Sequence, residues 1–380
     1  NTIERVTNYW GKDLPVNVGK DNFGTIRYEY FRDRTVMLEA LKSGAIDWRS
    51  ENSSKFWATA YDVPAVRDGR LIKREFTHER GTGMQGFVMN TRKPIFNDVK
   101  VREALTYLWD FEWVNKTIMY DAYARTDSYF ENSDLEATGL PGPEEMKVLE
   151  PLRDQLPPRV FTEDYAPPVT DGSGNSRQHL RTALELLKEA GWAIQDGVLT
   201  QTSTGAPFEF EVLLNQDLFT PHTQALVRGV ERLGGKVSIR VVDAAQYQSR
   251  VDSFDFDMII GNWGQSQSPG NEQREFWSSA AADRQGSRNT AGIKNPAIDT
   301  LIEDLIASPT RDVLVARTHA LDRALLWNFY VIPMYHSKVD RIAYWNRFGF
   351  PDETPMQGTS PNFWWVDPDL DSALQRNGRK

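Results

Sequence analysis

The most constraining feature of this chain is a regular alternation of strand and helix patterns between residues 208 and 261. The runs FEFEVLLN (208–215), KVSIRVVD (236–243) and FDFDMIIG (254–261) are rich in β-branched and aromatic residues, as strands are. Between them lie two helical patterns, DLFTPHTQALVRGVERLGG and AAQYQSRVDS. A strand–helix–strand–helix–strand order is typical of a parallel sheet with right-handed crossovers, so the sequence predicts an α/β fold.

The flanking segments extend this pattern. TIRYEY followed by TVMLEALKSG and AIDW predicts strand, helix and strand, with Gly44 at the helix end. Residues 131–176 are rich in Pro, Gly and acidic residues, and we expect a long ordered loop with short helical pieces. The 380 residues exceed one ordinary core, which indicates two domains.

Charge and cysteine content exclude several classes of function. The chain carries 44 Lys and Arg against 53 Asp and Glu, a net charge of -9, and no long basic stripe, so nucleic acid is not an expected partner. There is no cysteine, which rules out disulfides, a thiolate nucleophile and cysteine metal sites but leaves the cellular compartment open.

Three motifs favour structural interpretations. GTGMQG (81–86) fits the dinucleotide pattern G-x-G-x-x-G, but a strand pattern follows it where phosphate binding needs a helix N-terminus. DGSGNS (171–176) resembles a calcium loop but lacks the distal Glu, so we interpret it as a turn before a helix. The five histidines show no metal-ligand spacing, and we expect neither a metal nor a cofactor.

The loop GNWGQSQSPGNEQREFW (261–277) is the leading candidate for a binding site. It follows a predicted parallel strand, and ligands of open α/β sheets lie beyond the carboxyl ends of such strands. Aromatic rings offer flat contact surfaces, and Arg offers a planar donor fork to a carboxylate. RTDSYF (125–130) and GSRN (286–289) have a similar composition, although ordinary loop packing explains RTDSYF equally well.

Evidence for catalysis is weak. The chain has no G-x-S-x-G nucleophile motif. A pair of carboxylates for glycoside hydrolysis stays open as an alternative, because such pairs are spatial rather than sequential. We therefore expect a binding protein rather than an enzyme.

Several segments resemble one known family. TNYWGKDLPVNVG, TVMLEALKSGAIDW, FNDVKVREALTYLWDFEWVN, SPGNEQREFW, GSRNTAGIKNPAIDTLI and LDRALLWNFYVIPMYH resemble extracellular solute-binding proteins of the oligopeptide type (family 5), which deliver substrates to ABC importers. The Yej-type branch, associated with oligopeptides and microcin C, is the most similar. The resemblance covers the chain from Thr7 to about Asp369.

The resemblance implies a two-lobe, type II periplasmic-binding-protein architecture. We expect lobe I to comprise residues 1–89 and 333–380 and lobe II to comprise 90–332, with the βαβαβ unit around 177–261. Hinge positions are expected at Gly86, Asn90 and Pro333. Family members carry a signal peptide, further strands and a small domain before their counterpart of NYWG, so the chain resembles the C-terminal part of such a protein.

The implied function is capture of a peptide or peptide conjugate in the periplasm, by a monomer, for handover to a membrane permease. A muropeptide or another sugar-containing ligand is the alternative. Relatives often carry an acidic residue in the loop matching 263–269, whereas WGQSQSP has none, so we expect a ligand with a neutral end there. The expected ligand-binding residues are Trp263, Gln265, Ser266, Gln267, Ser268, Asn271, Glu272, Arg274, Trp277, Arg125, Tyr129, Arg288 and Asn289.

Overall fold

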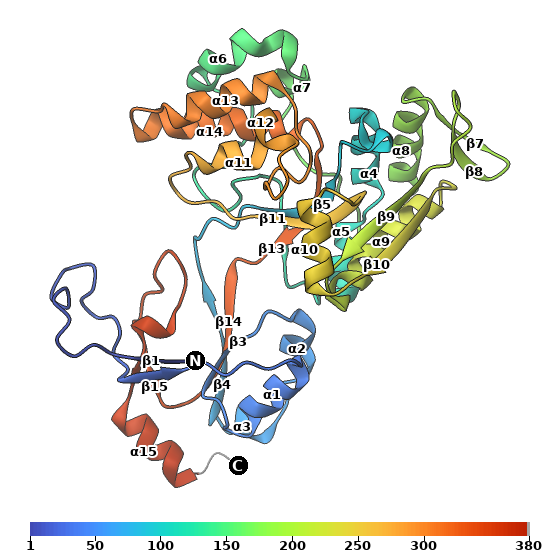
Figure 1. The fold of residues 1–380 in the computed structure, drawn as a ribbon. Helices are drawn as coiled ribbons and strands as arrows, with labels where there is room; N and C mark the ends of the chain where they lie inside the picture. The colour runs from blue at the N-terminus through green and yellow to red at the C-terminus, as the bar shows by residue number, and fades with distance from the viewer. Residues whose placement is uncertain (378–380) are drawn as a thin grey trace. The chain divides into compact units, whose positions relative to one another are not determined.

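The computed structural model describes residues 1–377 and divides them into two compact units (Figure 1). Unit 1 contains Asn1–Arg80 together with the segment from Ser337 onward, and unit 2 contains Gly81–His336. Each unit has hydrophobic core clusters of its own. Among the described helices, none is both long and apolar enough to cross a lipid bilayer.

Unit 2 is built on a five-stranded sheet in the order β10-β9-β11-β5-β12. The strands are β5 (Met84–Met89), β9 (Glu209–Leu214), β10 (Lys236–Val241), β11 (Met258–Trp263) and β12 (Val331–Pro333). Strands β10, β9 and β11 pair in parallel, as expected for the alternating segment 208–261. Strand β5 is inserted antiparallel between β11 and β12.

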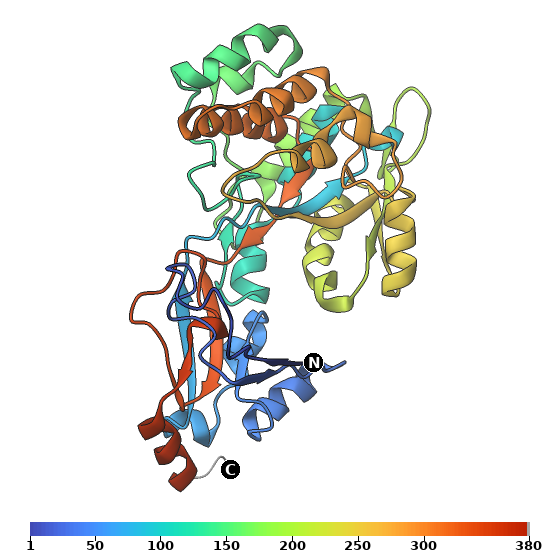
Figure 2. The same cartoon turned by 60° about the vertical axis from the view of Figure 1, so that its left-hand side comes forward.

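The helices of unit 2 pack on the two faces of this sheet or on one another. They are α4 (Val99–Tyr107), α5 (Phe111–Ile118), α6 (Pro143–Leu149), α7 (Arg159–Thr162), α8 (Arg177–Glu189), α9 (Thr220–Glu231), α10 (Ala244–Asp252), α11 (Glu272–Trp277), α12 (Ser279–Ala282), α13 (Pro296–Ile306) and α14 (Arg311–Leu326), with the 3-10 turns η1 (Pro94–Phe96), η2 (Glu150–Gln155) and η3 (Asp217–Phe219). Helix α13 packs on α14, and α6 lies against α14 (Figures 1 and 2).

Alternation along the strands divides the core of unit 2 into two clusters. In β5, Met84 and Val88 join one cluster, with α13 and α14, whereas Phe87 and Met89 join the other, with α4 and α9. This period of two is that of a sheet buried on both faces. Helix starts follow local capping, since Asp243 accepts hydrogen bonds from the first turn of α10 and Thr310 caps α14.

Short elements complete unit 2. A hairpin of β7 (Trp192–Gln195) and β8 (Val198–Gln201) follows α8, and β6 (Ala124–Arg125) pairs with β13 (Tyr335–His336). The turn predicted at DGSGNS is present, with Gly172 and Gly174 at positive φ.

Unit 1 contains a three-stranded sheet in which β14 (Val339–Trp345) lies between β3 (Trp48–Ser50) and β4 (Leu71–Thr77). Its helices are α1 (Arg34–Lys42), α2 (Ser54–Thr59), α3 (Pro64–Arg67) and α15 (Pro368–Asn377), with the turn η4 (Pro361–Phe363). Two further strand pairs are β1 (Thr2–Glu4) with β2 (Thr25–Arg27), and β15 (Phe348–Gly349) with β16 (Trp365–Val366).

The expected hinge positions lie inside unit 2. The chain passes between the units at Arg80–Gly81 and at His336–Ser337, rather than at residues 89–90 and 332–333. Gly86 and Pro333 face each other in the β5–β12 pair, and the Asn90 side chain donates hydrogen bonds to the Phe254 and Phe256 carbonyls. The unit boundaries therefore lie at residues 80–81 and 336–337 instead of at the expected positions, because sheet pairing and hydrogen bonds hold these residues in unit 2.

Candidate functional site

The carboxyl end of β11 has one open edge. On one side, β11 pairs with β5 along its whole length, from Met258 to Trp263. On the other side, it pairs with β9 only at Met258 and Ile259. Leu214, the last residue of β9, is level with Ile260, so the residues from Gly261 to Trp263 extend past the end of β9, at the place where ligands of open α/β sheets bind.

The Ile260 carbonyl and the main-chain groups of Asn262 point toward this open edge. The Gln85 carbonyl and the Met89 N–H of β5 bond to Met334 and Tyr330, on the β12 side, so the alternate residues Gly86 and Val88 bond to β11. Gly261 opposes Gly86 and takes part in that ladder, whereas its neighbours Ile260 and Asn262 point the other way.

Few groups of the protein occupy the open edge. The Ile260 carbonyl accepts a long bond of 3.4 Å from the Tyr247 hydroxyl, and the Asn262 carbonyl one of 3.3 Å from Arg288 Nη2. Within residues 1–377, the Asn262 N–H has no hydrogen-bond partner. An exposed strand edge of this kind is a template for pairing with another extended chain.

Two cavities flank the edge. One, of about 150 Å³, is lined by Gln85, Asn215, Gln216, Phe219 and Asn262, with Leu214, Tyr247, Ile260 and Gly261. The other, of about 200 Å³, lies between α10 and the segment 286–290 and includes Asp252 and Arg288. Tyr247, Ile260, Gly261 and Asn262 line both cavities, so the two adjoin along β11.

The aromatic residues expected to meet a ligand are in the core instead. Trp263, Trp277 and Tyr129 are 2%, 0% and 1% exposed. Their rings pack on one another, with centroids 4.7 Å apart for Trp263–Trp277 and 5.1 Å for Tyr129–Trp277. The expected ligand contacts at these three positions are corrected to core contacts, because no ring face is accessible.

Asn289 receives the same correction. Its side-chain amide is fully buried, donates to the Ser278 and Ile293 carbonyls, and accepts from the Gly292 and Ile293 N–H groups. All its hydrogen-bonding capacity thus holds the segment 289–293 in place.

The polar residues of the loop 264–272 bond mainly within unit 2. Gln265 Oε1 accepts from Gln273 Nε2 at 2.7 Å, Ser266 Oγ accepts from the Ser268 N–H, and Glu272 Oε1 accepts from the Gly270 N–H. The Gln267 carbonyl accepts from Arg311. Asn271 Oδ1 accepts from Arg274.

The three candidate arginines lie in different settings. Arg274 forms a two-pronged ion pair with Glu303 of α13. Arg125 is half-buried, with its guanidinium covered over the rings of Trp109 and Phe111, and its three guanidinium nitrogens have no hydrogen-bond partner within the described residues. Burial lowers the pKa of Arg125 to about 10. Only Arg288 is exposed beside β11, with its guanidinium 4.3 Å from the Phe276 ring centroid.

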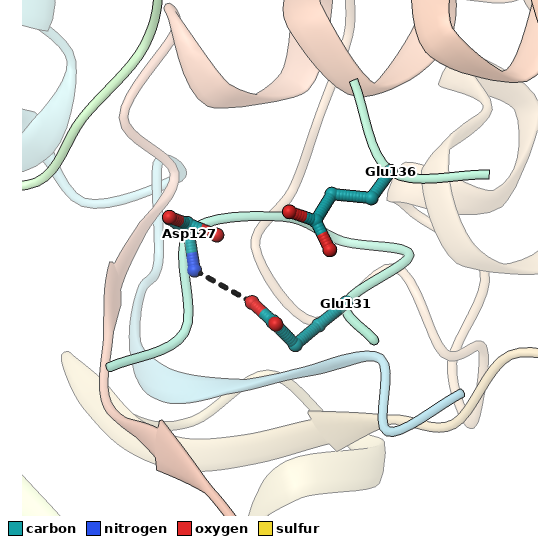
Figure 3. Close-up of side chains that lie close together, drawn as sticks. All are labelled: Asp127, Glu131 and Glu136. Carbon is teal, nitrogen blue, oxygen red and sulfur yellow. Dashed lines mark hydrogen bonds between the residues drawn. The ribbon is translucent and has the colours of Figure 1, made fainter. Parts of the chain in front are cut away.

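Sequence reasoning missed a carboxylate cluster at the end of the segment 125–130. Carboxylate oxygens of Asp127, Glu131 and Glu136 all lie within 4.8 Å of one another (Figure 3). Glu131 accepts a hydrogen bond from the Asp127 N–H at 3.0 Å and lies 3.4 Å from His336 Nε2. Burial, together with the two neighbouring carboxylates, raises the pKa of Glu131 to about 8.

A larger cavity, of about 690 Å³, lies in unit 1 between the segments 25–29 and 45–50. Aromatic side chains of Phe23, Phe31, Trp48, Phe348 and Trp364 contribute to its lining. We assign the candidate site to β11, because there a strand edge, polar side chains and cavities coincide.

Comparison with known proteins places the chain in a family. The model for bacterial extracellular solute-binding proteins, family 5 (middle region), matches residues 1–285. The chain is 45% identical over 367 residues to the probable peptide-binding protein YejA of Agrobacterium fabrum strain C58, covering 96% of this chain and 60% of that protein. It is 40% identical over 370 residues to the peptidoglycan-binding protein YepA of the same strain, covering 95% and 60%. The chain thus spans about three fifths of these relatives.

Solved structures share the fold. The oligopeptide-binding protein AppA of Bacillus subtilis, in complex with a nonapeptide, matches with a TM-score of 0.67 and 17% identity over 90% of this chain and 60% of that one. DppA of Helicobacter pylori, in complex with the peptide STSA, matches with a TM-score of 0.66 and 14% identity over 96% and 60%. The predicted α/β fold of the two-lobe, type II kind is confirmed. The chain therefore belongs to the bacterial extracellular solute-binding proteins of family 5.

Proposed function

We propose that this chain binds an extended peptide, or the peptide part of a conjugate, along the open edge of β11. The observation that carries the proposal is the main-chain geometry of β11 beyond its pairing with β9, where the Ile260 carbonyl and the main-chain groups of Asn262 point toward the open edge. Pairing with main-chain groups gives affinity that tolerates many side-chain sequences.

Membership of the family supports the rest of the proposal. The bound peptide is handed to the permease of an ABC importer, and this takes place in the periplasm. The name of the YejA relative supports a peptide ligand. The name of the YepA relative supports, as a second candidate, a peptide attached to an amino sugar. The proposed function is binding without chemistry, so the ligand returns unaltered.

Penta-alanine and its fully N-methylated form are the matched ligands for a first test. N-methylation removes the main-chain donors and leaves the side chains unchanged. We expect calorimetry to detect binding of penta-alanine, and penta-alanine to raise the melting temperature of the protein. The methylated peptide should do neither, because only penta-alanine can complete the strand ladder. Mass spectrometry of the recovered peptide checks that it is intact, and cleavage products would contradict a pure binding function.

A substitution at Asn262 localises the binding. Asn262→Pro removes the N–H that points to the open edge, and proline is tolerated at strand edges. We expect about a tenfold or greater loss of penta-alanine affinity. Asn262→Ala keeps the N–H and serves as the control. Penta-alanine has no side-chain amide that could bond to the Asn262 carboxamide, so the expected loss is less than about threefold. Equal losses in the two variants would show that the main chain of β11 does not bind the peptide.

A further inference from the structure

The 150 Å³ cavity beside β11 is lined by an unusual set of side chains. Four of its nine lining residues are carboxamides: Gln85, Asn215, Gln216 and Asn262. They come from three separate parts of the sequence, since Gln85 lies in β5, Asn262 lies opposite it in β11, and Asn215 and Gln216 follow β9. The lining contains no Asp, Glu, Lys, Arg or His.

These carboxamides are not engaged with the rest of the protein. Within residues 1–377, none of the four side-chain amides forms a hydrogen bond. Asn215, Gln216 and Asn262 are exposed and Gln85 is half-buried, so these amides are open to water or a ligand, unlike the buried Asn289, whose amide is fully used. Each carboxamide offers two N–H donors and one oxygen acceptor, so the cavity presents donors and acceptors together.

A neutral lining selects among possible occupants. A charged group entering the cavity would lose water and gain no opposite charge from the lining, which is unfavourable. A neutral group that both donates and accepts loses less solvation and finds partners of both kinds. The side walls, Phe219 and Tyr247, add ring surface that suits a short apolar portion such as a methyl group.

We infer that this cavity binds a neutral hydrogen-bonding group of the ligand, an amide or an acetamido group. The inference rests on the proposed function in placing that group on a ligand that pairs with β11. A cavity of about 150 Å³ is large enough to bind benzene, with its six heavy atoms, so a group of four heavy atoms fits. We therefore assign recognition of a neutral ligand group, which was expected at Gln265, Ser266 and Gln267, to these four residues instead.

Acetamide and acetate provide a direct test, because they have nearly the same size and differ in charge. The 15N side-chain amide resonances of the four residues, in protein labelled at Asn and Gln, are titrated with each compound. Acetamide is expected to shift them, and acetate at the same concentration is not. Equal shifts with acetate, or no shift with either compound, would overturn the inference.

Short peptides test the same preference with a ligand that can also pair with β11. Ala-Ala-Gln-Ala-Ala is expected to bind about tenfold tighter than Ala-Ala-Glu-Ala-Ala, since only the charged side chain is left without a counter-charge. Gln216→Glu supplies a negative charge and is expected to shift the preference toward Ala-Ala-Lys-Ala-Ala. Gln246→Glu, an exposed change of the same charge on α10 outside the cavity lining, is the control and is expected to leave the preference unchanged.

The outcomes separate the two proposals. If acetamide shifts the four resonances and no peptide binds, the assignment of the cavity stands and the proposed function fails. If penta-alanine binds and acetamide is not distinguished from acetate, the proposed function stands and the inference fails. A Gln216→Glu variant with unchanged preference would also overturn the inference.

Discussion

At the scale of single residues, the tryptophans near β11 are structural. Trp263 is 2% exposed and donates from Nε1 to the Arg288 carbonyl at 3.0 Å. Trp263→Ala is expected to destabilise the protein by about 3–5 kcal/mol, the usual cost of emptying a buried aromatic site. Denaturant unfolding measures this change. Trp10→Ala, at a position that is 81% exposed, is the control and is expected to change stability by less than about 0.5 kcal/mol.

A second substitution, Trp263→Phe, tests whether Trp263 contacts the ligand. Trp263→Phe keeps most of the apolar volume and loses the bond to the Arg288 carbonyl, so we expect a loss of about 1–2 kcal/mol. Peptide affinity should change little in this folded variant, since the ring faces Tyr129 and Trp277. A large loss of affinity with little loss of stability would restore the original prediction of a ligand contact.

The carboxylate cluster makes stability depend on pH. The folded protein holds the Glu131 proton up to about pH 8, whereas the unfolded chain releases it near 4.5. Folding therefore takes up a proton in this window, and the stabilising effect of Glu131 protonation, complete below pH 4.5, is lost as pH rises toward 8. The groups that face Glu131 are Asp127, Glu136 and His336.

Glu131→Gln tests this pH dependence. The variant is neutral at every pH and keeps an oxygen for the Asp127 N–H. Its melting temperature is expected to exceed that of the parent by about 2–4 °C or more at pH 8.5 and to match it near pH 5. Glu144→Gln, exposed on α6, changes the same charge and is expected to have no such effect. Parallel pH profiles for the parent and Glu131→Gln would contradict the argument.

At the scale of elements, local pattern predicted the types and order of the segments around β11. Strand composition and helical periodicity are local, and β9, α9, β10, α10 and β11 follow one another in the chain. Strand β5 is different, because its insertion between β11 and β12 depends on residues more than 150 positions away. No periodicity reveals that Gln85 opposes Asn262, so the carboxamide cavity was not predictable.

The loop after β11 shows a second limit of sequence reasoning. Its composition of amides, serines and tryptophans indicated a non-repetitive segment over residues 261–277, which holds only for residues 264–271, because Gly261–Trp263 belong to β11 and Glu272–Trp277 form α11. Composition alone does not distinguish a tryptophan that meets a ligand from one that fills a core, because both uses favour a large ring. Burial of Trp263 and Trp277 depends on Tyr129, from a distant segment that reaches the same cluster. The site therefore shifts from the rings of the loop to the edge of β11.

At the scale of the whole molecule, the two units differ in how the chain builds them. Both core clusters of unit 2 consist of residues between Met84 and Tyr335, within one continuous segment. Unit 1 is discontinuous, since the central strand β14 of its sheet follows unit 2 in sequence. This difference predicts that one unit can fold from a single fragment and the other cannot.

Expression of residues 81–336 and of residues 1–80 as separate fragments tests this prediction. The fragment 81–336 is expected to unfold cooperatively and to keep the near-ultraviolet circular dichroism of packed aromatics, because it contains all its core residues. The fragment 1–80 is expected to lack a cooperative transition, because β3 and β4 lose the strand between them. Adding residues 337–380 to the fragment 1–80 through a flexible linker restores β14 and is expected to restore the transition. If 81–336 were to collapse without fixed aromatic packing, its core would need residues outside the segment, and the autonomy assigned to unit 2 would be wrong.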